Sequence, residues 1–279
     1  MAETTASIPI YILTPDKRVA APYRASSLAD AIAHEPQGVY TVARTYQSDH
    51  ALLLDAHLDR LEQSARLAGI PLHLDRDHLR TGLRTLLHEA NYADAKFRIT
   101  VPETAPTHIY LSLEPFRPVP DAIQQVGAHV ITVPLVRENP VVKTTAWMMA
   151  RHSTVESLPE GIYEGIMLSE DQRLLEGMSS NFYGVLNGTL FTAGNGVLEG
   201  ITRKAVIACV PDDLPLEMTA LHRDDILHLS EAMLTSSGRG VVPITSIDGQ
   251  PVGSGNVGPL VKTIRQRYDD WAMAHIKPI

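Results

Sequence analysis

Cysteine is almost absent from this sequence, since Cys209 is the only one in 279 residues. A single cysteine excludes an intrachain disulfide and any metal site built from Cys-x-x-Cys pairs. Cys209 lies on the apolar stripe of a helix expected to begin near residue 202, so we expect a buried, unreactive thiol. The sequence also lacks an excess of basic residues, because 24 Lys and Arg stand against 32 Asp and Glu. The net charge of −8 argues against nonspecific binding to nucleic acids or anionic membranes.

Long hydrophobic runs and several catalytic motifs are missing as well. No apolar stretch approaches the ~20 residues that a membrane-spanning helix requires. Residues 1–7 lack the basic start and apolar core of a signal peptide, so we expect a cytoplasmic protein. The motifs HExxH, GxSxG, GxxxxGKS/T and GxGxxG do not occur, and the 12 histidines are scattered, so no metal site is expected.

The chain is long enough for one large domain or two smaller ones, and its 44% apolar and 20% charged residues are typical of a globular protein. Its clearest linker is the stretch of residues 114–121, which holds three prolines. We therefore predict an N-terminal domain of residues 1–117 and a C-terminal domain of residues 118–279.

Strand and helix patterns alternate in the predicted N-terminal domain. Residues 39–46, VYTVARTY, are rich in β-branched and aromatic residues and predict a strand with Tyr40 and Arg44 on one face. An arginine on such a face suits either a surface position or the binding of a carboxylate. Two amphipathic helices and two paired strands are then expected at residues 55–68, 75–89, 96–101 and 108–113.

Two further arginines in this half stand next to apolar positions. Arg60 lies beside the apolar stripe of the first predicted helix. At such a position an arginine either has a functional role or packs its aliphatic part on the protein and extends its guanidinium to solvent. Arg98 falls in the middle of a strand, and an inward-facing arginine there needs a partner or a ligand.

The densest set of signals lies in residues 165–203, where short apolar runs alternate with turns. Asn187-Gly188 between apolar runs predicts a type I′ hairpin, because both residues of that turn adopt positive φ. Glu176 is expected to end a strand and to lead into a loop of small residues. Further on, Thr202 suits the N-cap of a helix, and the N–H groups at a helix start attract phosphate.

Four segments follow one another along the chain in a telling order: Arg60 in HLDRL, Lys143 in VVKTT, Glu176 in LLEGMSSNF, and GITR at residues 200–203. Together they resemble the class IV aminotransferases, which are the fold type IV pyridoxal-phosphate enzymes. This family includes branched-chain aminotransferases, D-amino acid aminotransferases and aminodeoxychorismate lyases. The resemblance runs from about residue 40 to about residue 243.

The resemblance implies a mixed α/β (α+β) fold with two domains, a small N-terminal α/β domain and a larger β-rich domain with the cofactor between them. It also implies pyridoxal 5′-phosphate (PLP) as cofactor and a homodimer as assembly. PLP chemistry needs an amine that binds the aldehyde, an acidic partner for the ring nitrogen, and a phosphate clamp. Family positions assign the amine to Lys143 and the acid to Glu176. The clamp residues that the resemblance implies are Arg60, Ile201, Thr202, Ser236 and Ser237.

By the same resemblance, Lys143 would move a proton at the substrate Cα, so that an amino acid and a 2-oxo acid are interconverted. Branched-chain members usually carry a tyrosine where this chain has Met148, and they read FEGxR where it has YTVAR at residues 40–44. Both differences argue against the branched-chain assignment, and since D-amino acid aminotransferases and the lyases tolerate an apolar residue after the lysine, we expect a transaminase that acts on D-amino acids. The implied substrate pocket includes Tyr40 and an arginine that binds the carboxylate through two parallel hydrogen bonds, with Arg44 and Arg98 as candidates.

Three alternatives stay open. The chain resembles branched-chain L-amino acid aminotransferases and also aminodeoxychorismate lyases, which use the same cofactor but eliminate pyruvate and need no 2-oxo acid acceptor. A reading from another class is a non-catalytic small-molecule-binding protein in which Lys143 is a surface residue.

Overall fold

The structure is a computed structural model that describes residues 7–279, so most of the segment 1–7 judged not to be a signal peptide lies outside the described residues. The chain divides into two compact units. One unit consists of Met1–Arg117, Val142–Ala150 and His275–Ile279, and the other of Pro118–Val141 and Arg151–Ala274. Two segments that the sequence assigned to the second domain thus group with the first unit.

The first unit is built on a seven-stranded sheet in the order β16-β4-β3-β5-β6-β1-β2. Its strands are β1 (Ile10–Leu13), β2 (Arg18–Ala20), β3 (Gly38–Tyr46), β4 (His50–Leu52), β5 (Ala95–Pro102), β6 (Ile109–Pro115) and β16 (Ile276–Pro278). The long strand β3 pairs antiparallel with β5 in a register that sets Val42 opposite Arg98. The strands predicted at residues 39–46, 96–101 and 108–113 are confirmed within a residue or two.

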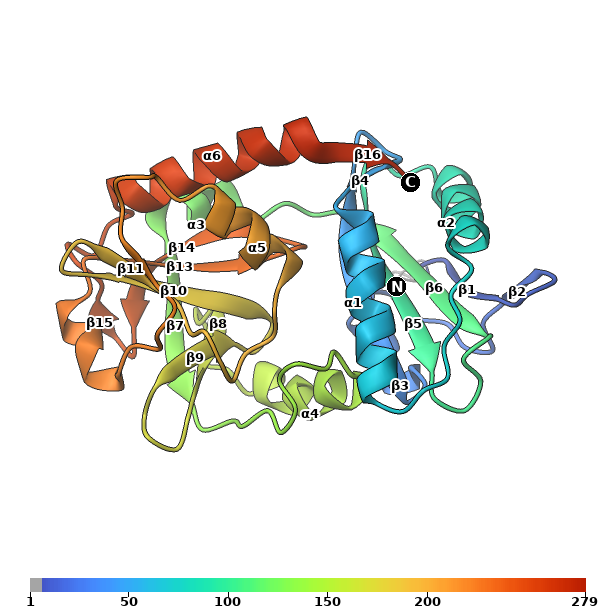
Figure 1. The fold of residues 1–279 in the computed structure, drawn as a ribbon, viewed down its shortest axis with the longest axis horizontal. Helices are drawn as coiled ribbons and strands as arrows, with labels where there is room; N and C mark the ends of the chain where they lie inside the picture. Colours follow the sequence, from blue (N-terminus) through green and yellow to red (C-terminus); the bar gives the residue numbers. More distant parts are fainter. Residues whose placement is uncertain (1–6) are drawn as a thin grey trace, which may run out of the picture. The chain divides into compact units, whose positions relative to one another are not determined.

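Helices α1 (Leu54–Leu67) and α2 (Arg76–Ala90) pack on one face of this sheet (Figure 1). Leucines at helical spacing, such as Leu58 and Leu61 on α1, reach a core formed with alternate residues of β3, β5 and β6. Asp75 caps α2 by accepting a hydrogen bond from the His78 N–H at 2.9 Å. The 3₁₀ helix Asp30–His34 and the chain before it form a separate small apolar cluster.

Two segments from later in the chain complete the first unit. Strand β16 pairs antiparallel with β4, and Ile279 is 2% exposed in the same core as α1 and α2. The start of α4 (Thr145–Glu156) is tied to β3, since the Gly38 N–H donates to Thr145 Oγ1 at 2.9 Å and the Tyr40 N–H donates to the Lys143 carbonyl at 3.0 Å. These two hydrogen bonds place Lys143 beside β3.

A nine-stranded sheet forms the second unit, in the order β12-β11-β10-β13-β14-β7-β8-β9 with β15 paired to β14. Because β9 pairs with both β8 and β10, the strands from β10 through β13, β14, β7, β8 and β9 close into a barrel. The strands are β7 (Ala128–Val133), β8 (Glu164–Leu168), β9 (Leu174–Gly177), β10 (Ser180–Leu186), β11 (Thr189–Phe191), β12 (Leu216–Glu217), β13 (Glu231–Ser236), β14 (Gly240–Ile247) and β15 (Gln250–Pro251).

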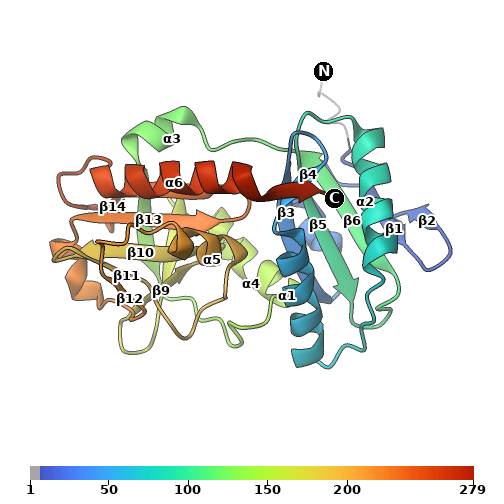
Figure 2. The same cartoon turned by 45° about the horizontal axis from the view of Figure 1, so that its top comes forward.

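Three helices accompany these strands: α3 (Asp121–Val126), α5 (Ile201–Ala208) and α6 (Pro259–His275). Helix α6 lies beside α3 (Figure 2), and Arg265 Nη1 donates to the Gln124 carbonyl at 3.0 Å and to Gln124 Oε1 at 2.7 Å. The 3₁₀ helix Arg223–His228 begins at a capping box built by His222 and Asp225.

Of three local predictions for the second unit, one is confirmed and two are wrong. The Asn187-Gly188 hairpin is confirmed, with φ of 50° and 76° at the two residues. Thr202 is not the N-cap of α5, because Gly200 holds that position with extended φ and ψ. The expected loop after Glu176 is a tight turn instead, since Ser180 pairs with Gly177 and Asn181 with Glu176. Strand pairing across the turn makes the small residues part of the hairpin.

Candidate functional site

Lys143 in the first unit stands over an aromatic ring. Its side-chain Nζ lies 4.7 Å from the centre of the Tyr40 ring. The backbone N–H of Lys143 donates to Ser64 Oγ on α1 at 3.2 Å. Tyr40 is itself buried and packs against Ile32 and Met148. The amine is therefore held at a half-buried position between β3 and α1.

Arg60 and His57 lie one helical turn apart on α1 and share the Thr41 hydroxyl of β3. Arg60 Nη2 donates to Thr41 Oγ1 at 3.3 Å, and Thr41 Oγ1 lies 2.9 Å from His57 Nδ1. A guanidinium can only donate, so the Thr41 hydroxyl accepts from Arg60, and its own proton remains available to His57 Nδ1. Burial, followed by the charges of Arg60 and Lys143, lowers the pKa of His57 well below its ordinary value, so this ring is neutral. Arg60 is 8% exposed, which excludes the interpretation of a solvent-extended surface arginine.

Arg98 forms a buried ion pair with Glu35. Its Nε and Nη2 donate to Glu35 Oε1 at 3.1 and 2.5 Å, and its Nη1 donates to the Leu28 carbonyl at 2.8 Å. The side chains are 3% and 0% exposed. The inward-facing arginine thus has an internal carboxylate as its partner, and this arrangement does not support Arg98 as a clamp for a substrate carboxylate.

Arg44 has a different environment from Arg98. Its guanidinium carbon lies 3.9 Å from the Tyr46 ring centre and 4.3 Å from the Phe116 ring centre. Two aromatic rings hold the charged group by cation–π contacts. Within residues 7–279, no acidic side chain forms an ion pair with Arg44.

Glu176 in the second unit is 3% exposed and bound by several donors. Arg137 Nη1 donates to its Oε1 at 3.2 Å, and Asn181 Nδ2 and the Leu198 N–H donate to its Oε2 at 3.3 and 3.0 Å. Asn181 also donates to the Leu198 carbonyl at 2.9 Å, which ties the carboxylate to the turn before α5. A side chain at Gly200 would collide with Asn181, since a Cβ built there lies 2.2 Å from Asn181 Oδ1.

The start of α5 meets the loop between β13 and β14. Thr202 Oγ1 donates to Ser237 Oγ at 3.1 Å, which joins residues 35 positions apart in the sequence. The N–H groups of Ile201 and Thr202 belong to the first turn of the helix, where no intrahelical carbonyl accepts them. Helix N–H groups and hydroxyls together form an anion-binding arrangement. The second unit thus brings together Glu176, Ile201, Thr202 and Ser237, four of the predicted site residues.

Comparisons with known proteins show which family the chain resembles over most of its length. Residues 38–247 match the family described as amino-transferase class IV. The chain belongs to this family. It is 30% identical over 245 residues to the D-alanine aminotransferase of Bacillus licheniformis, covering 82% of this chain and 85% of that protein. It is 25% identical over 260 residues to the branched-chain-amino-acid aminotransferase of Pseudomonas aeruginosa, covering 85% and 84%. A solved branched-chain amino acid aminotransferase (T.th.) with pyridoxamine 5′-phosphate matches with a TM-score of 0.83 at 19% identity, over 99% of each chain.

This class IV aminotransferase has the fold type IV architecture and is a PLP-dependent transaminase that converts amino acids and 2-oxo acids. Its own residues fit the cofactor. A phosphate calls for helix N–H groups and hydroxyls, which Ile201, Thr202 and Ser237 provide, and a protonated ring nitrogen calls for a buried carboxylate, which Glu176 provides. An aldehyde calls for a primary amine, and Lys143 has one.

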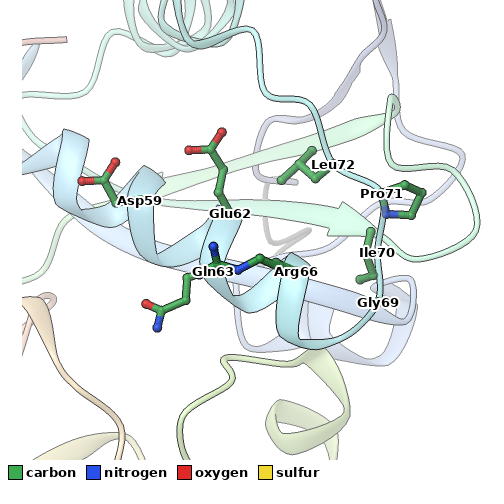
Figure 3. A pocket seen from close by; sticks show the side chains of 8 residues that line it. All are labelled: Asp59, Glu62, Gln63, Arg66, Gly69, Ile70, Pro71 and Leu72. Carbon is green, nitrogen blue, oxygen red and sulfur yellow. The ribbon is translucent and has the colours of Figure 1, made fainter.

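A depression of about 550 Å³ on the aminotransferase's first unit lies elsewhere (Figure 3). It is lined by Asp59, Glu62, Gln63, Arg66, Gly69, Ile70, Pro71 and Leu72. None of the predicted site residues lines it, and its two acids already pair with Arg76. This depression is therefore not the site of the chemistry.

Sequence reasoning missed several polar residues around the predicted ones. Arg137 and Asn181 contact Glu176, and the buried Glu164 forms an ion pair with the half-buried Arg239 at 2.7 Å. Burial acts to raise the pKa of Glu164, but the Arg239 charge and hydrogen bonds from Arg239 and Ser179 outweigh it, so that this pKa lies below its ordinary value. The GRG sequence after Ser237 was the one available signal for Arg239.

Across residues 7–279, no helix combines the length and apolar character needed to cross a membrane. The same described residues hold no group of three or more His, Cys, Asp or Glu side chains that is arranged to bind a metal ion.

Proposed function

We propose that this aminotransferase binds PLP through Lys143, with Glu176 at the ring nitrogen and a phosphate clamp of Arg60, Ile201, Thr202, Ser236 and Ser237. The observation that carries the proposal is the hydrogen-bonded connection from Glu176 through Asn181 and Leu198 to the start of α5. This connection joins the carboxylate that the ring nitrogen requires to the helix start that the phosphate requires. In the first unit, Arg60 and Lys143 are close enough that both lower the pKa of His57.

Each proposed residue has a defined task. Bound PLP supplies an electron-withdrawing ring that makes the Cα–H bond of the amino acid acidic. Lys143 Nζ would accept the proton from Cα of the amino acid and deliver it to C4′ of the cofactor, which is the proton shift that interconverts an amino acid and a 2-oxo acid. Glu176 keeps a negative charge where a ring N–H needs an acceptor, and its burial makes that charge-assisted hydrogen bond strong.

The test of the cofactor assignment is Lys143→Ala, with the exposed Lys204→Ala as matched control. Purified wild-type protein should show a visible absorbance band that borohydride removes by fixing the cofactor on the chain. Lys143→Ala should keep its fold yet lose the covalent linkage and essentially all turnover, while Lys204→Ala should keep both. A colourless wild-type protein that borohydride leaves unchanged would favour the non-catalytic binding protein.

For the substrate, we propose D-amino acids as preferred donors and Arg44 as the residue that binds the substrate carboxylate. Arg44 carries a charge held between two rings, and Arg98 is already neutralised by Glu35. The D-alanine aminotransferase of Bacillus licheniformis, at 30% identity, is a relative consistent with this choice. Met148 in place of a tyrosine supports it as well.

A panel of D- and L-amino acids with 2-oxoglutarate or pyruvate tests the substrate proposal. D-Alanine or D-glutamate should outperform L-leucine, and Arg44→Ala should raise the KM for amino acids at least ten-fold, as expected for losing a charge-assisted hydrogen bond. Primary amines without a carboxylate should be much less affected. Preferential use of L-leucine, L-isoleucine or L-valine would establish the branched-chain alternative, and turnover without any 2-oxo acid would establish the lyase. We also propose a homodimer, which sedimentation of the purified protein tests.

A further inference from the structure

An ion pair between the buried Glu164 and the half-buried Arg239 ties together three segments of the second unit. Glu164, the first residue of β8, is 3% exposed, and its Oε2 accepts from Arg239 Nη1 at 2.7 Å. Its Oε1 accepts from the Ser179 N–H at 2.6 Å and from Ser179 Oγ at 2.9 Å. Ser179 lies in the turn that follows Glu176. The carboxylate therefore joins β8 to the hairpin that carries the proposed ring-nitrogen partner.

Arg239 extends the same connection to the β13–β14 loop. Its Nη2 donates to the Ser179 carbonyl at 3.2 Å and to Ser179 Oγ at 2.8 Å, while its Nε donates to Ser236 Oγ at 2.9 Å. The planar guanidinium makes these bonds in fixed directions, which a flexible ammonium group cannot do. One side chain thus holds the Glu176 hairpin and the proposed phosphate loop together.

The hydrogen bond from Arg239 to Ser236 also limits the acceptors to which the Ser236 hydroxyl can donate. A guanidinium has no acceptor, so Ser236 Oγ must accept from Arg239, and its own proton is left for another acceptor. A phosphate oxygen is such an acceptor. Ser237, the next residue, is held in turn by Thr202 on α5.

We propose that Arg239, fixed by Glu164, is a positioning residue that orients the Ser236 hydroxyl toward the cofactor phosphate and sets the phosphate loop relative to Glu176. This inference rests on the proposed function, because it takes Ser236 and Ser237 as phosphate-binding. It assigns Arg239 no contact with substrate or cofactor. Its expected effect is on recognition of the phosphate group rather than of the ring.

The test compares the affinity of the apo-protein for PLP with its affinity for pyridoxal, which lacks the phosphate. Arg239→Gln should weaken PLP binding about ten-fold or more, the usual cost of a lost charge-assisted contact, and change pyridoxal binding less than about two-fold. Arg223→Gln, which removes an exposed ion pair with Asp248 in the same unit, is the matched control and should change neither. Inorganic phosphate should compete with PLP less well in Arg239→Gln than in wild type.

Arg239→Lys separates positioning from stability. Lysine keeps the charge beside Glu164 but cannot contact Ser236 and Ser179 at the same time, so we expect a thermal midpoint near that of wild type and a reduced preference for PLP over pyridoxal. A wild-type preference in Arg239→Lys, or an equal loss of both ligands in Arg239→Gln, would refute the positioning role. If the wild-type apo-protein itself shows no preference for PLP over pyridoxal, the proposed function fails and not this inference alone.

Discussion

At the scale of single residues, a substitution at Glu176 can remove the negative charge of the side chain while its shape is kept. Glu176→Gln keeps the side-chain volume and can still accept from the Leu198 N–H, which donates to Oε2 at 3.0 Å in wild type. It loses the negative charge that stabilises a protonated ring nitrogen, so single-turnover rates should fall about ten-fold or more while PLP binding largely persists. Stopped-flow absorbance with a D-amino acid measures this directly, and unchanged rates would rule out the role.

Arg98 and Glu35 give a prediction about stability instead of catalysis. Arg98→Ala leaves the Glu35 carboxylate, 0% exposed, without its counter-charge and should lower the free energy of unfolding by about 3–5 kcal/mol. The double variant with Glu35→Ala should recover part of that loss, because no charge is then left buried. Urea unfolding of the single and double variants checks this. A large rise in KM with unchanged stability would restore Arg98 as the carboxylate clamp.

The candidate residues were predictable from the sequence, but their neighbours were not. Lys143, Glu176 and Arg60 stand in short motifs whose order is visible without a structure. The pairing of Arg98 with Glu35 was not visible, because Glu35 lies 63 positions from Arg98 and no local pattern links them. The role of Asn181 was hidden for the same reason, since strand pairing, and not the run of small residues, places it opposite Glu176.

At the scale of elements, helix α1 presents His57, Arg60 and Ser64 toward β3 and the Lys143 segment. His57 has a pKa well below its ordinary 6.5 in the folded chain because of burial, Arg60 and Lys143. In the unfolded chain that pKa returns to 6.5, so below this pH only the unfolded state gains a proton. The free energy of unfolding therefore falls as pH drops from 6.5 toward the folded pKa.

We predict that His57→Gln weakens this pH dependence. Between about pH 7.5 and 5.5, the variant should lose about 1 kcal/mol less stability than the wild type does, since one pH unit below the unfolded pKa corresponds to ~1.4 kcal/mol for a single proton. Chemical denaturation of the apo-proteins at the two pH values gives the comparison. His228→Gln, at an exposed histidine, serves as control, and an identical pH dependence in wild type and His57→Gln would show that His57 is not the group responsible.

Element prediction succeeded where the pattern was local. Helices α1 and α2 and strand β3 match their expected ranges closely, because apolar spacing and β-branched content determine them. The N-cap of α5 was misplaced at Thr202, because its hydroxyl bonds to Ser237 in the β13–β14 loop instead of capping its own helix. The short strand β16 depends on a partner more than 200 residues away, β4, and had no distinct local signature.

At the scale of the whole molecule, the first unit draws on three stretches of the chain. A fragment of residues 1–117 would leave β4 without β16 and would remove Val142 and Ile279 from the core. We expect this fragment to be much less stable than the intact chain and to aggregate, because an edge strand and apolar surface are exposed. The longer fragment 1–150 restores Val142 and the Thr145–Gly38 bonds and should be intermediate. Circular dichroism with urea titration tests both fragments, and cooperative unfolding of 1–117 at full-length stability would contradict the expectation.

The pairing of β16 with β4 also has a consequence for biosynthesis. A ribosome releases residues 50–52 early and residues 276–278 only at the end of this sequence, yet these two segments form adjacent strands of one sheet. The barrel strands of the second unit, from Ala128 to Ile247, emerge in between and can pair with one another first. The sheet of the first unit, whose other strands are translated before the second unit, is therefore completed only after the barrel strands have emerged, and until then its β4 edge stays exposed to other nascent chains and to chaperones.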